Sequence, residues 1–247
     1  MTAAEGNDTV DDAQRRAYLT AMGIPVWQSR APVGDAVLAD SAAPSAPMQS
    51  PIDGGDPWSI LRAEVRECTR CALHSSRTQT VFGVGNERAE WLIIGEAPGA
   101  EEDRLGEPFV GRAGKLLDNM LFAIGLNRRT AYIANVIKCR PPQNRDPLPD
   151  EVASCAGYLR RQIQLIKPKL ILAVGRVAAH DLLKSADSLA NLRGKIHTYP
   201  GSDIPVIVTY HPAYLLRSPG EKHRAWEDLK FAVSVYNNAA DHATNSA

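Results

Sequence analysis

The apolar residues between Trp58 and Tyr236 follow two alternating patterns along the chain. Four short runs are almost continuously apolar, as expected of strands that are buried on both faces of a sheet. The segments between these runs repeat apolar residues every three or four positions, which is typical of helices packed on a sheet. The predicted strands are residues 91–95, 132–138, 170–174 and 205–210, and the predicted helices are residues 58–67, 115–124, 150–166, 177–183 and 221–236.

Strands that alternate with helices predict an α/β fold with three layers, α/β/α, around a central four-stranded parallel sheet. Gly125 follows the helix predicted at 115–124 and is expected to end it, and Asp150 is the expected N-cap of the helix at 150–166. In the last helix, Trp226, Leu229 and Val233 are expected to face the core.

The first 57 residues differ in composition from the rest of the chain. Residues 9–22 could form a short helix, whereas residues 28–57 are rich in Ala, Pro, Ser and Gly and carry few large apolar side chains. Such a segment cannot bury enough surface to offset the entropy of ordering it, so we expect it to be disordered. The predicted organisation is an N-terminal extension at 1–57, one folded domain at 58–237 and a disordered tail at 238–247.

Charge is unevenly distributed, although the whole chain has a formal net charge of zero. Residues 1–57 hold eight acidic and three basic residues, which leaves 20 acidic and 25 basic residues in the remainder. A mildly basic domain is compatible with a polyanionic partner such as nucleic acid. The sequence has no signal peptide pattern and no apolar run of membrane-spanning length, so we expect a cytoplasmic protein with reduced cysteines and no membrane partner.

The chain has four cysteines, and the first two form a Cys-x2-Cys pair. Two thiolates at this spacing can reach a common metal centre, and an all-cysteine set holds either zinc or an iron–sulfur cluster. The spacing does not separate these two cofactors, and four unrelated buried thiols are the remaining alternative. The four candidates are Cys68, Cys71, Cys139 and Cys155.

Three of the predicted strands end in polar loops, at residues 95–103, 138–145 and 211–217. The carboxyl ends of parallel strands meet at one edge of the sheet, where open α/β sheets place their sites. Asn135 lies in a predicted strand, where asparagine is unfavourable, so its amide serves either a structural hydrogen bond or a ligand. Phe109 is either part of the core or a stacking surface for a base, and the leucines after His211 either cover the core or insert into a partner.

Four segments carry these candidate residues in a fixed order: Gly95-Glu-Ala-Pro-Gly-Ala-Glu-Glu-Asp103, Pro108-Phe-Val-Gly111, Asn135-Val-Ile-Lys-Cys-Arg-Pro-Pro142 and His211-Pro-Ala-Tyr-Leu-Leu-Arg217. Together they closely resemble the motifs of the family-4 uracil-DNA glycosylases. The resemblance extends from about Trp58 to Tyr236 and leaves residues 1–57 outside. It implies that Cys68, Cys71, Cys139 and Cys155 are the ligands of a [4Fe–4S] cluster.

The resemblance also implies roles for residues of the three loops. Gly95, Glu96 and Ala97 would line the uracil pocket, Phe109 would stack on the base, Asn135 would read its edge, and His211 would hydrogen-bond the uracil O2. Leu215, Leu216 and Arg217 would form the loop that enters the duplex.

The first loop departs from the wider superfamily. Well-known uracil glycosylases have Gly-Gln-Asp-Pro-Tyr there, with the aspartate orienting water and the tyrosine excluding thymine. This chain has Ala97 and Gly99 at those two places. We therefore expect Glu102 to handle the water and to screen out thymine.

The expected function is a DNA repair glycosylase that flips uracil out of single- or double-stranded DNA and hydrolyses its N-glycosidic bond. A monomer is expected, with a possible protein partner for residues 1–57. Two alternatives are an iron–sulfur electron carrier and a non-catalytic nucleic-acid-binding module on the same fold. Release of free uracil from DNA would separate these three functions.

Overall fold

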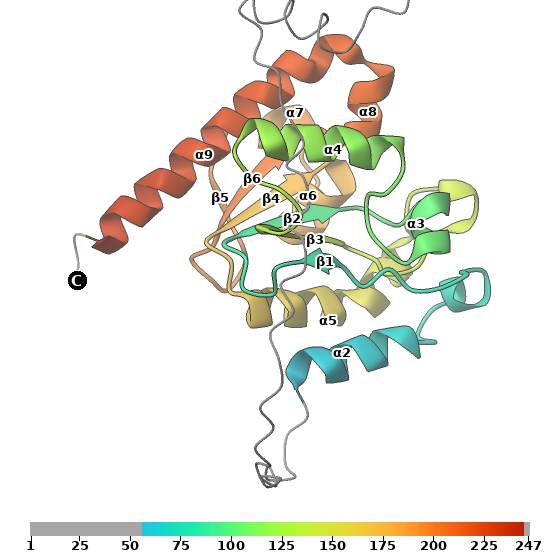
Figure 1. Ribbon diagram of the computed structural model, residues 1–247. Coiled ribbons are helices and arrows are strands. Elements are labelled where there is room, and N and C mark those ends of the chain that lie inside the picture. The colour runs from blue at the N-terminus through green and yellow to red at the C-terminus, as the bar shows by residue number, and fades with distance from the viewer. Residues whose placement is uncertain (1–55, 245–247) are drawn as a thin grey trace, which may run out of the picture. The chain divides into compact units, whose positions relative to one another are not determined.

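The computed structural model describes residues 56–244, which belong to one compact unit. In this part of the chain, a six-stranded sheet lies between two layers of helices (Figure 1). The short helix predicted at residues 9–22 and the linker predicted at 28–57 lie outside the described residues, except for the last two linker positions. No helix within residues 56–244 is long and apolar enough to cross a membrane.

The sheet has the strand order β1-β3-β2-β4-β6-β5. Its four central strands pair in parallel and correspond to the four strands predicted from the apolar runs: β2 (Trp91–Gly95), β3 (Ala131–Asn135), β4 (Leu170–Val174) and β6 (Pro205–Thr209). The prediction of four strands was incomplete, because β1 (Val84–Gly85) and β5 (His197–Thr198) add antiparallel edges. Strands of two residues are too short to show a pattern of apolar positions.

The five predicted helices are present, with ends that shift by a few residues except at the end of α9, which continues from the predicted residue 236 to Thr244. They are α2 (Pro57–Arg66), α4 (Arg112–Ala123), α5 (Pro149–Ile166), α6 (Arg176–Leu183) and α9 (Lys222–Thr244). Three short helices were not predicted: α3 (Ala100–Leu105), α7 (Leu189–Leu192) and α8 (Pro212–Arg217). Single 3-10 turns are η1 (Ala72–Ser75), η2 (Pro142–Asn144) and η3 (Pro219–Glu221).

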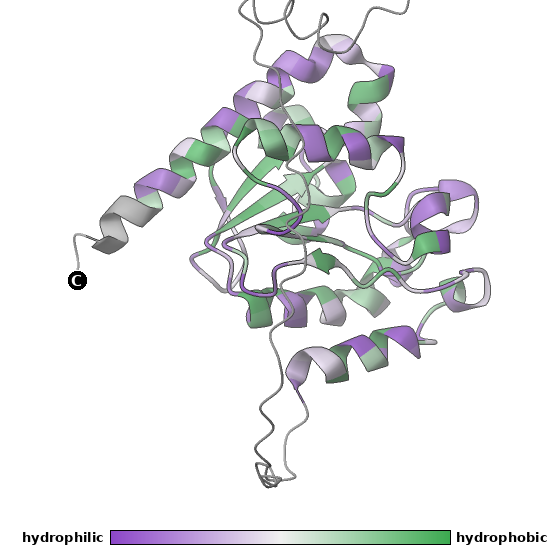
Figure 2. Ribbon diagram, viewed as in Figure 1, coloured by the Kyte–Doolittle hydropathy of each residue, from purple (hydrophilic) through white to green (hydrophobic). Residues whose placement is uncertain are grey.

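Alternate residues of the buried strands point to opposite faces of the sheet. The strands are mostly apolar, as their colour in Figure 2 shows. Trp91 and Ile93 of β2 pack in one cluster with α4 and α9, and Leu92 and Ile94 pack in the other with α2, α5 and α6. This alternation follows from the two-residue period of a strand. The three-layer α/β/α prediction is confirmed.

Three local predictions were wrong. The N-cap of α5 is Leu148 and not Asp150, and the Leu148 amide donates to the Glu151 Oε2 at 2.8 Å. Trp226 of α9 is 40% exposed instead of facing the core. The helix α9 continues to Thr244, so the boundary predicted at residue 237 falls inside it. Gly125 does end α4, with the positive φ of 80° expected of a glycine after a helix.

Strand register brings the polar loops to one edge of the sheet. Gly95 at the end of β2 pairs with Asn135 at the end of β3, and Val174 at the end of β4 pairs with Thr209 at the end of β6. The chain therefore leaves all four parallel strands at the same edge. The segments that follow β2, β3 and β6 meet there, as predicted from their order in the sequence.

Substitution of two helical glycines tests how tightly the Phe109 backbone packs against α4, because the two glycines differ in the space around them. A Cβ at Gly114 of α4 would lie 1.6 Å from the Phe109 carbonyl oxygen, whereas a Cβ at Gly157 of α5 would meet nothing within 4 Å. We expect Gly157→Ala to stabilise the fold by about 0.5–1 kcal/mol, as helix propensity predicts. Gly114→Ala should destabilise it by roughly 1–3 kcal/mol through overpacking. Urea unfolding measures both, and equal stability of the two variants would show that the Phe109 backbone does not pack against α4.

Candidate functional site

A cavity of about 420 Å³ opens at this edge of the sheet. Its walls come from the segments that follow β2, β3 and β6, together with Phe109 and the end of α8. Most of the residues predicted for the base-binding site line it. The lining includes Glu96, Ala97, Pro98, Gly99, Glu102, Phe109, Asn135, Asn144, Arg145, Asp146, His211, Tyr214 and Arg217.

Gly95 lets two of these side chains approach each other behind the cavity. A Cβ at this position would lie 2.4 Å from the Phe109 Cζ and 2.5 Å from the Asn135 Oδ1. Asn135 is only 2% exposed. Among residues 56–239, its Oδ1 is the one buried side-chain oxygen or nitrogen that has no hydrogen-bond partner. Buried polar atoms are nearly always paired, so this oxygen is free for a donor on a bound molecule.

His211 presents a neutral ring to the same cavity. Its Nδ1 accepts a hydrogen bond from the Ala213 amide at 3.1 Å at the start of α8. The ring proton therefore lies on Nε2, which is left as a donor. Burial lowers the pKa of His211 to about 4, and the positive charge of Arg217 acts in the same direction. The ring centroid lies 5.6 Å from that of Phe109.

Glu102 holds the loop that carries Phe109. One carboxylate oxygen, Oε1, accepts from the amides of Val110 at 2.9 Å and Gly111 at 3.1 Å. The other oxygen, Oε2, accepts from the Gly99 amide at 3.1 Å. Because both oxygens are engaged by the backbone, the structure favours a positioning role for Glu102 over the predicted role in handling water.

Three acids line this cavity, Glu96, Glu102 and Asp146, and the carboxyl group of Glu96 differs from that of Glu102 in its surroundings. It is half-buried and faces the Asp146 side chain, whereas the backbone amides that donate to an acid of this cavity within the described residues go to Glu102. Burial raises the pKa of Glu96 to about 7, with a further contribution from Asp146 and an opposing one from Arg176. Glu96 therefore changes its charge near neutral pH. The sequence predicted Glu96 as a pocket residue and missed this property, because desolvation depends on the folded surroundings.

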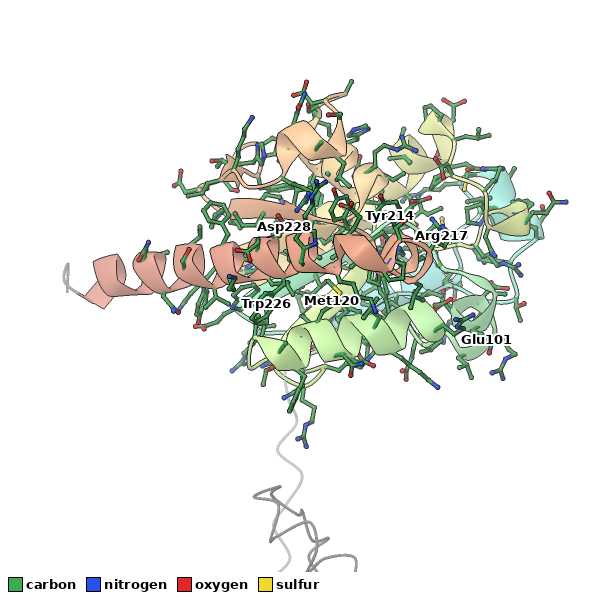
Figure 3. All side chains as sticks on the ribbon, turned by 90° about the horizontal axis from the view of Figure 1, so that it is seen from above. Glu101, Met120, Tyr214, Arg217, Trp226 and Asp228 are labelled. Atoms are coloured by element: carbon green, nitrogen blue, oxygen red, sulfur yellow. The ribbon has the colours of Figure 1, made fainter. Side chains whose placement is uncertain are left out.

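The segment predicted to enter DNA is the short helix α8, and one of its predicted residues is wrong. Leu215 has no exposed surface and packs in the core cluster under α4 and α9, so it is not available for insertion. Leu216 is half-buried, and Arg217 is exposed and lines the cavity. Tyr214, which was not among the predicted site residues, also lines the cavity and is 36% exposed. Figure 3 labels Tyr214 and Arg217, both of α8.

The four cysteines meet at a second cavity beside α2 and α5. All of them line it, although they come from positions as far apart as Cys68 and Cys155. The Arg77 Nη1 donates to the Cys139 Sγ at 3.0 Å, and the Lys138 amide donates to the Cys155 Sγ at 3.3 Å. Burial raises the pKa of the Cys155 thiol to about 11 and also raises the pKa of Cys139. Within residues 56–244, no three Cys, His, Asp or Glu side chains are arranged to hold a single metal ion.

Lys138 lies between the two cavities, because it lines the cysteine cavity and contacts the backbone of Asn135. It was not among the predicted site residues. Its side chain is 1% exposed, and its Nζ donates to the Asn135 carbonyl oxygen at 2.9 Å and the Gln162 Oε1 at 2.6 Å. A lysine directly after an apolar strand is a signal that the sequence did contain. The lysine holds the carboxyl end of β3, while its own amide contacts a cysteine of the second cavity.

Comparison with known proteins identifies the class to which this fold and these cavities belong. The family model of the uracil DNA glycosylase superfamily matches residues 82–230. The type-4 uracil-DNA glycosylase of Archaeoglobus fulgidus is 46% identical over 173 residues, which cover 68% of this chain and 87% of that protein. The type-4 uracil-DNA glycosylase of Thermotoga maritima is 43% identical over 178 residues, with 71% of this chain and 92% of that protein covered. The chain therefore belongs to the type-4 group of the uracil-DNA glycosylase superfamily.

The charge and tautomer of His211 can be measured directly. We expect the imidazole to remain neutral, with its proton on Nε2, from neutral pH down to about pH 4. Two-dimensional NMR of the ring nitrogens in ¹⁵N-labelled protein reports both properties. A titration centred near the ordinary histidine pKa of about 6.5 would contradict the buried, capped geometry.

Proposed function

We propose that this protein removes uracil from DNA by hydrolysing the N-glycosidic bond, which leaves an abasic site. The observation that carries this proposal is the unpaired Asn135 Oδ1, buried in a cavity that also presents the Nε2–H of a neutral His211. Relatives named type-4 uracil-DNA glycosylases cover about 70% of the chain. An electron carrier would have no need of a cavity with these polar groups.

The Asn135 amide selects the base by its pattern of donors and acceptors. Uracil presents a donor at N3 and an acceptor at O4, which match the amide oxygen and the amide NH₂ group. Cytosine presents an acceptor at N3 and a donor at N4, so it would leave both sides of the pair unsatisfied. A site built from buried polar groups rejects such a base strongly. The Phe109 ring forms the flat wall on which the base stacks.

His211 stabilises the departing uracil. Cleavage of the bond between N1 and C1′ leaves a uracil anion whose charge is delocalised to O2. The Nε2–H of His211 donates to O2 as that charge develops, and Pro212 and the Ala213 amide fix the ring in advance. The lowered pKa keeps His211 neutral at physiological pH, so it acts as a hydrogen-bond donor and does not transfer a proton to the base.

Glu96 is the acid that acts on the sugar and the water. Its carboxyl group lies in the cavity, whereas the Glu102 carboxylate is occupied by three backbone amides. As a carboxylate, Glu96 orients water towards C1′ and balances the positive charge of the oxocarbenium-like sugar. Glu102 acts indirectly, by holding the loop that carries Phe109.

DNA is held at the rim of the cavity. Flipping a base from the duplex costs a few kcal/mol, which contacts to the strand have to offset. Arg217 is exposed at the rim and is placed to bind phosphate, and Leu216 is the remaining apolar residue of the predicted insertion segment. A cytoplasmic location, a monomeric state and a protein partner for residues 1–57 stay predictions from the sequence.

The four cysteines are the ligands of a [4Fe–4S] cluster in this proposal. The donor set consists of four thiols around one cavity, with an arginine and a backbone amide that donate to two of the sulfurs. Such hydrogen bonds stabilise thiolates in a cluster. The cluster would join α2, the loop after β3 and α5, which is a structural role.

Release of uracil tests the function, and Asn135→Asp tests the assignment of the base-reading residue. Wild-type protein should release free uracil from single- and double-stranded DNA. Asn135→Asp loses the NH₂ donor to O4, so kcat/KM on uracil-DNA should fall by about 5- to 150-fold, corresponding to roughly 1–3 kcal/mol. Asn119→Asp, at an exposed position of α4, is the matched control and should retain full activity. Equal kcat/KM values for the two variants would rule out the role of Asn135.

The pH dependence of kcat tests the role of Glu96. Because its pKa is raised to about 7, Glu96 is protonated below that pH and becomes a carboxylate above it. We expect kcat to rise as the pH passes through about 7. Glu96→Gln should abolish this rise and lower kcat by roughly 10²- to 10⁴-fold. The exposed Glu101→Gln is the control and should leave the profile unchanged, and a Glu96→Gln variant that still shows the rise would assign it to another group.

Iron analysis and absorption spectroscopy test the cofactor. Anaerobically purified protein should be brown, with broad absorption in the blue, and Cys139→Ser should lose most of both the iron and the colour. The same variant should have a lower melting temperature if the cluster is structural. Stoichiometric zinc without iron in the wild-type protein would refute the iron–sulfur assignment.

A further inference from the structure

Arg128 lies in the turn between α4 and β3, outside the four motifs at residues 95–103, 108–111, 135–142 and 211–217. Its guanidinium group nevertheless reaches the loop that carries Phe109. The Nη1 donates to the Pro108 carbonyl oxygen at 2.9 Å, the Nη2 donates to the Phe109 carbonyl oxygen, and the Nε donates to the Asp118 Oδ1 at 2.7 Å. One side chain thus binds two successive carbonyl groups of this loop and is itself oriented by a carboxylate of α4.

Phe109 needs such support because its backbone conformation is unusual. Its φ is 55°, in the left-handed region that bulky residues rarely adopt. A bulky residue in this backbone conformation destabilises the fold by about 1–3 kcal/mol, so it is found where several surrounding contacts hold the backbone in place. Gly114 supplies part of this support by leaving room for the Phe109 carbonyl group.

Opposite charges hold the two sides of the same loop. The cationic Arg128 binds the carbonyl oxygens of residues 108 and 109, and the anionic Glu102 binds the amides of residues 110 and 111. Each charge is thus matched to the polar groups it meets. Arg128 does not line the cavity, so its influence on a bound base passes through the loop.

We propose that Arg128 is a positioning residue that sets the Phe109 ring at the stacking distance for the flipped base. This inference rests on the proposed function, because it concerns the same base-binding cavity. The ring is 6% exposed, adjoins the His211 ring and lies so close to Gly95 that no Cβ fits there. A displaced ring would deform the space between Asn135 and His211, although both of those side chains would remain in place.

Contacts to two carbonyl oxygens and a carboxylate at once require the planar guanidinium group of arginine, which carries five N–H donors. A lysine at position 128 could neutralise Asp118 or contact one carbonyl oxygen, but it lacks the fixed fork that bridges two carbonyls and a carboxylate. The conservative substitution Arg128→Lys should therefore resemble Arg128→Met. A role of charge alone would instead be rescued by lysine.

The experiment separates binding of the base from binding of the DNA strand. The dissociation constant of free uracil is measured by calorimetry, and that of a single-stranded oligonucleotide with one tetrahydrofuran abasic site by fluorescence anisotropy. Arg128→Met and Arg128→Lys should both weaken uracil binding by about 10- to 100-fold, the range for hydrogen bonds to a charged group. Affinity for the abasic oligonucleotide should change less than about 2-fold. Arg129→Met, an exposed arginine of the same turn, should behave as wild type in both measurements.

The possible results are distinguishable from one another. Arg128 variants that fold and bind uracil as tightly as the wild type would overturn the inference, as would a parallel loss of affinity for uracil and for the abasic oligonucleotide. Rescue by Arg128→Lys would also overturn it, since charge would then suffice. If Arg128→Met fails to fold, the folded Arg128→Lys variant decides the question. A wild-type protein that binds uracil without releasing it from DNA would refute the proposed function but leave the comparison of Arg128 variants valid.

Discussion

The close approach of Phe109, Gly95 and Asn135 is the constraint on which the site depends. The parallel pairing of β2 with β3 places Gly95 opposite Asn135, and the absence of a side chain at Gly95 lets the Phe109 ring close over that pair. The loop that carries the ring has to adopt a left-handed backbone and to be bound on both sides. A base-sized space results, with a flat apolar wall and one unpaired amide oxygen.

Desolvation tunes two titratable groups of this space, His211 and Glu96, and it shifts their pKa values in opposite directions. Burial makes the charged form of each group less stable, so it lowers the pKa of His211 and raises the pKa of Glu96. At neutral pH the site therefore holds a fixed neutral donor and an acid that ionises close to the working pH. The first suits a leaving anion, and the second suits water and a cationic sugar.

Much of this account could be predicted from the sequence, because apolar runs report burial and strand order reports which loops meet. The four parallel strands and the gathering of Glu96, Asn135 and His211 follow from those two rules, whereas the convergence of the four cysteines was implied by the Cys-x2-Cys spacing and by the family resemblance. The missed features depend on tertiary contacts. The hydrogen bonds of Glu102 to backbone amides, the burial of Leu215 beneath α4 and the bonds of Arg128 to a loop some 20 residues away leave no local pattern in the chain.

Inhibition by free bases tests most directly whether the unpaired Asn135 oxygen reads the N3–H of uracil. Uracil and 3-methyluracil differ at that position, where the methyl group removes the donor and adds bulk. We predict that uracil inhibits release of the base from uracil-DNA competitively, and that 3-methyluracil inhibits at least about 10-fold more weakly because the buried oxygen stays unpaired. Equal inhibition by the two bases would contradict the central role of Asn135.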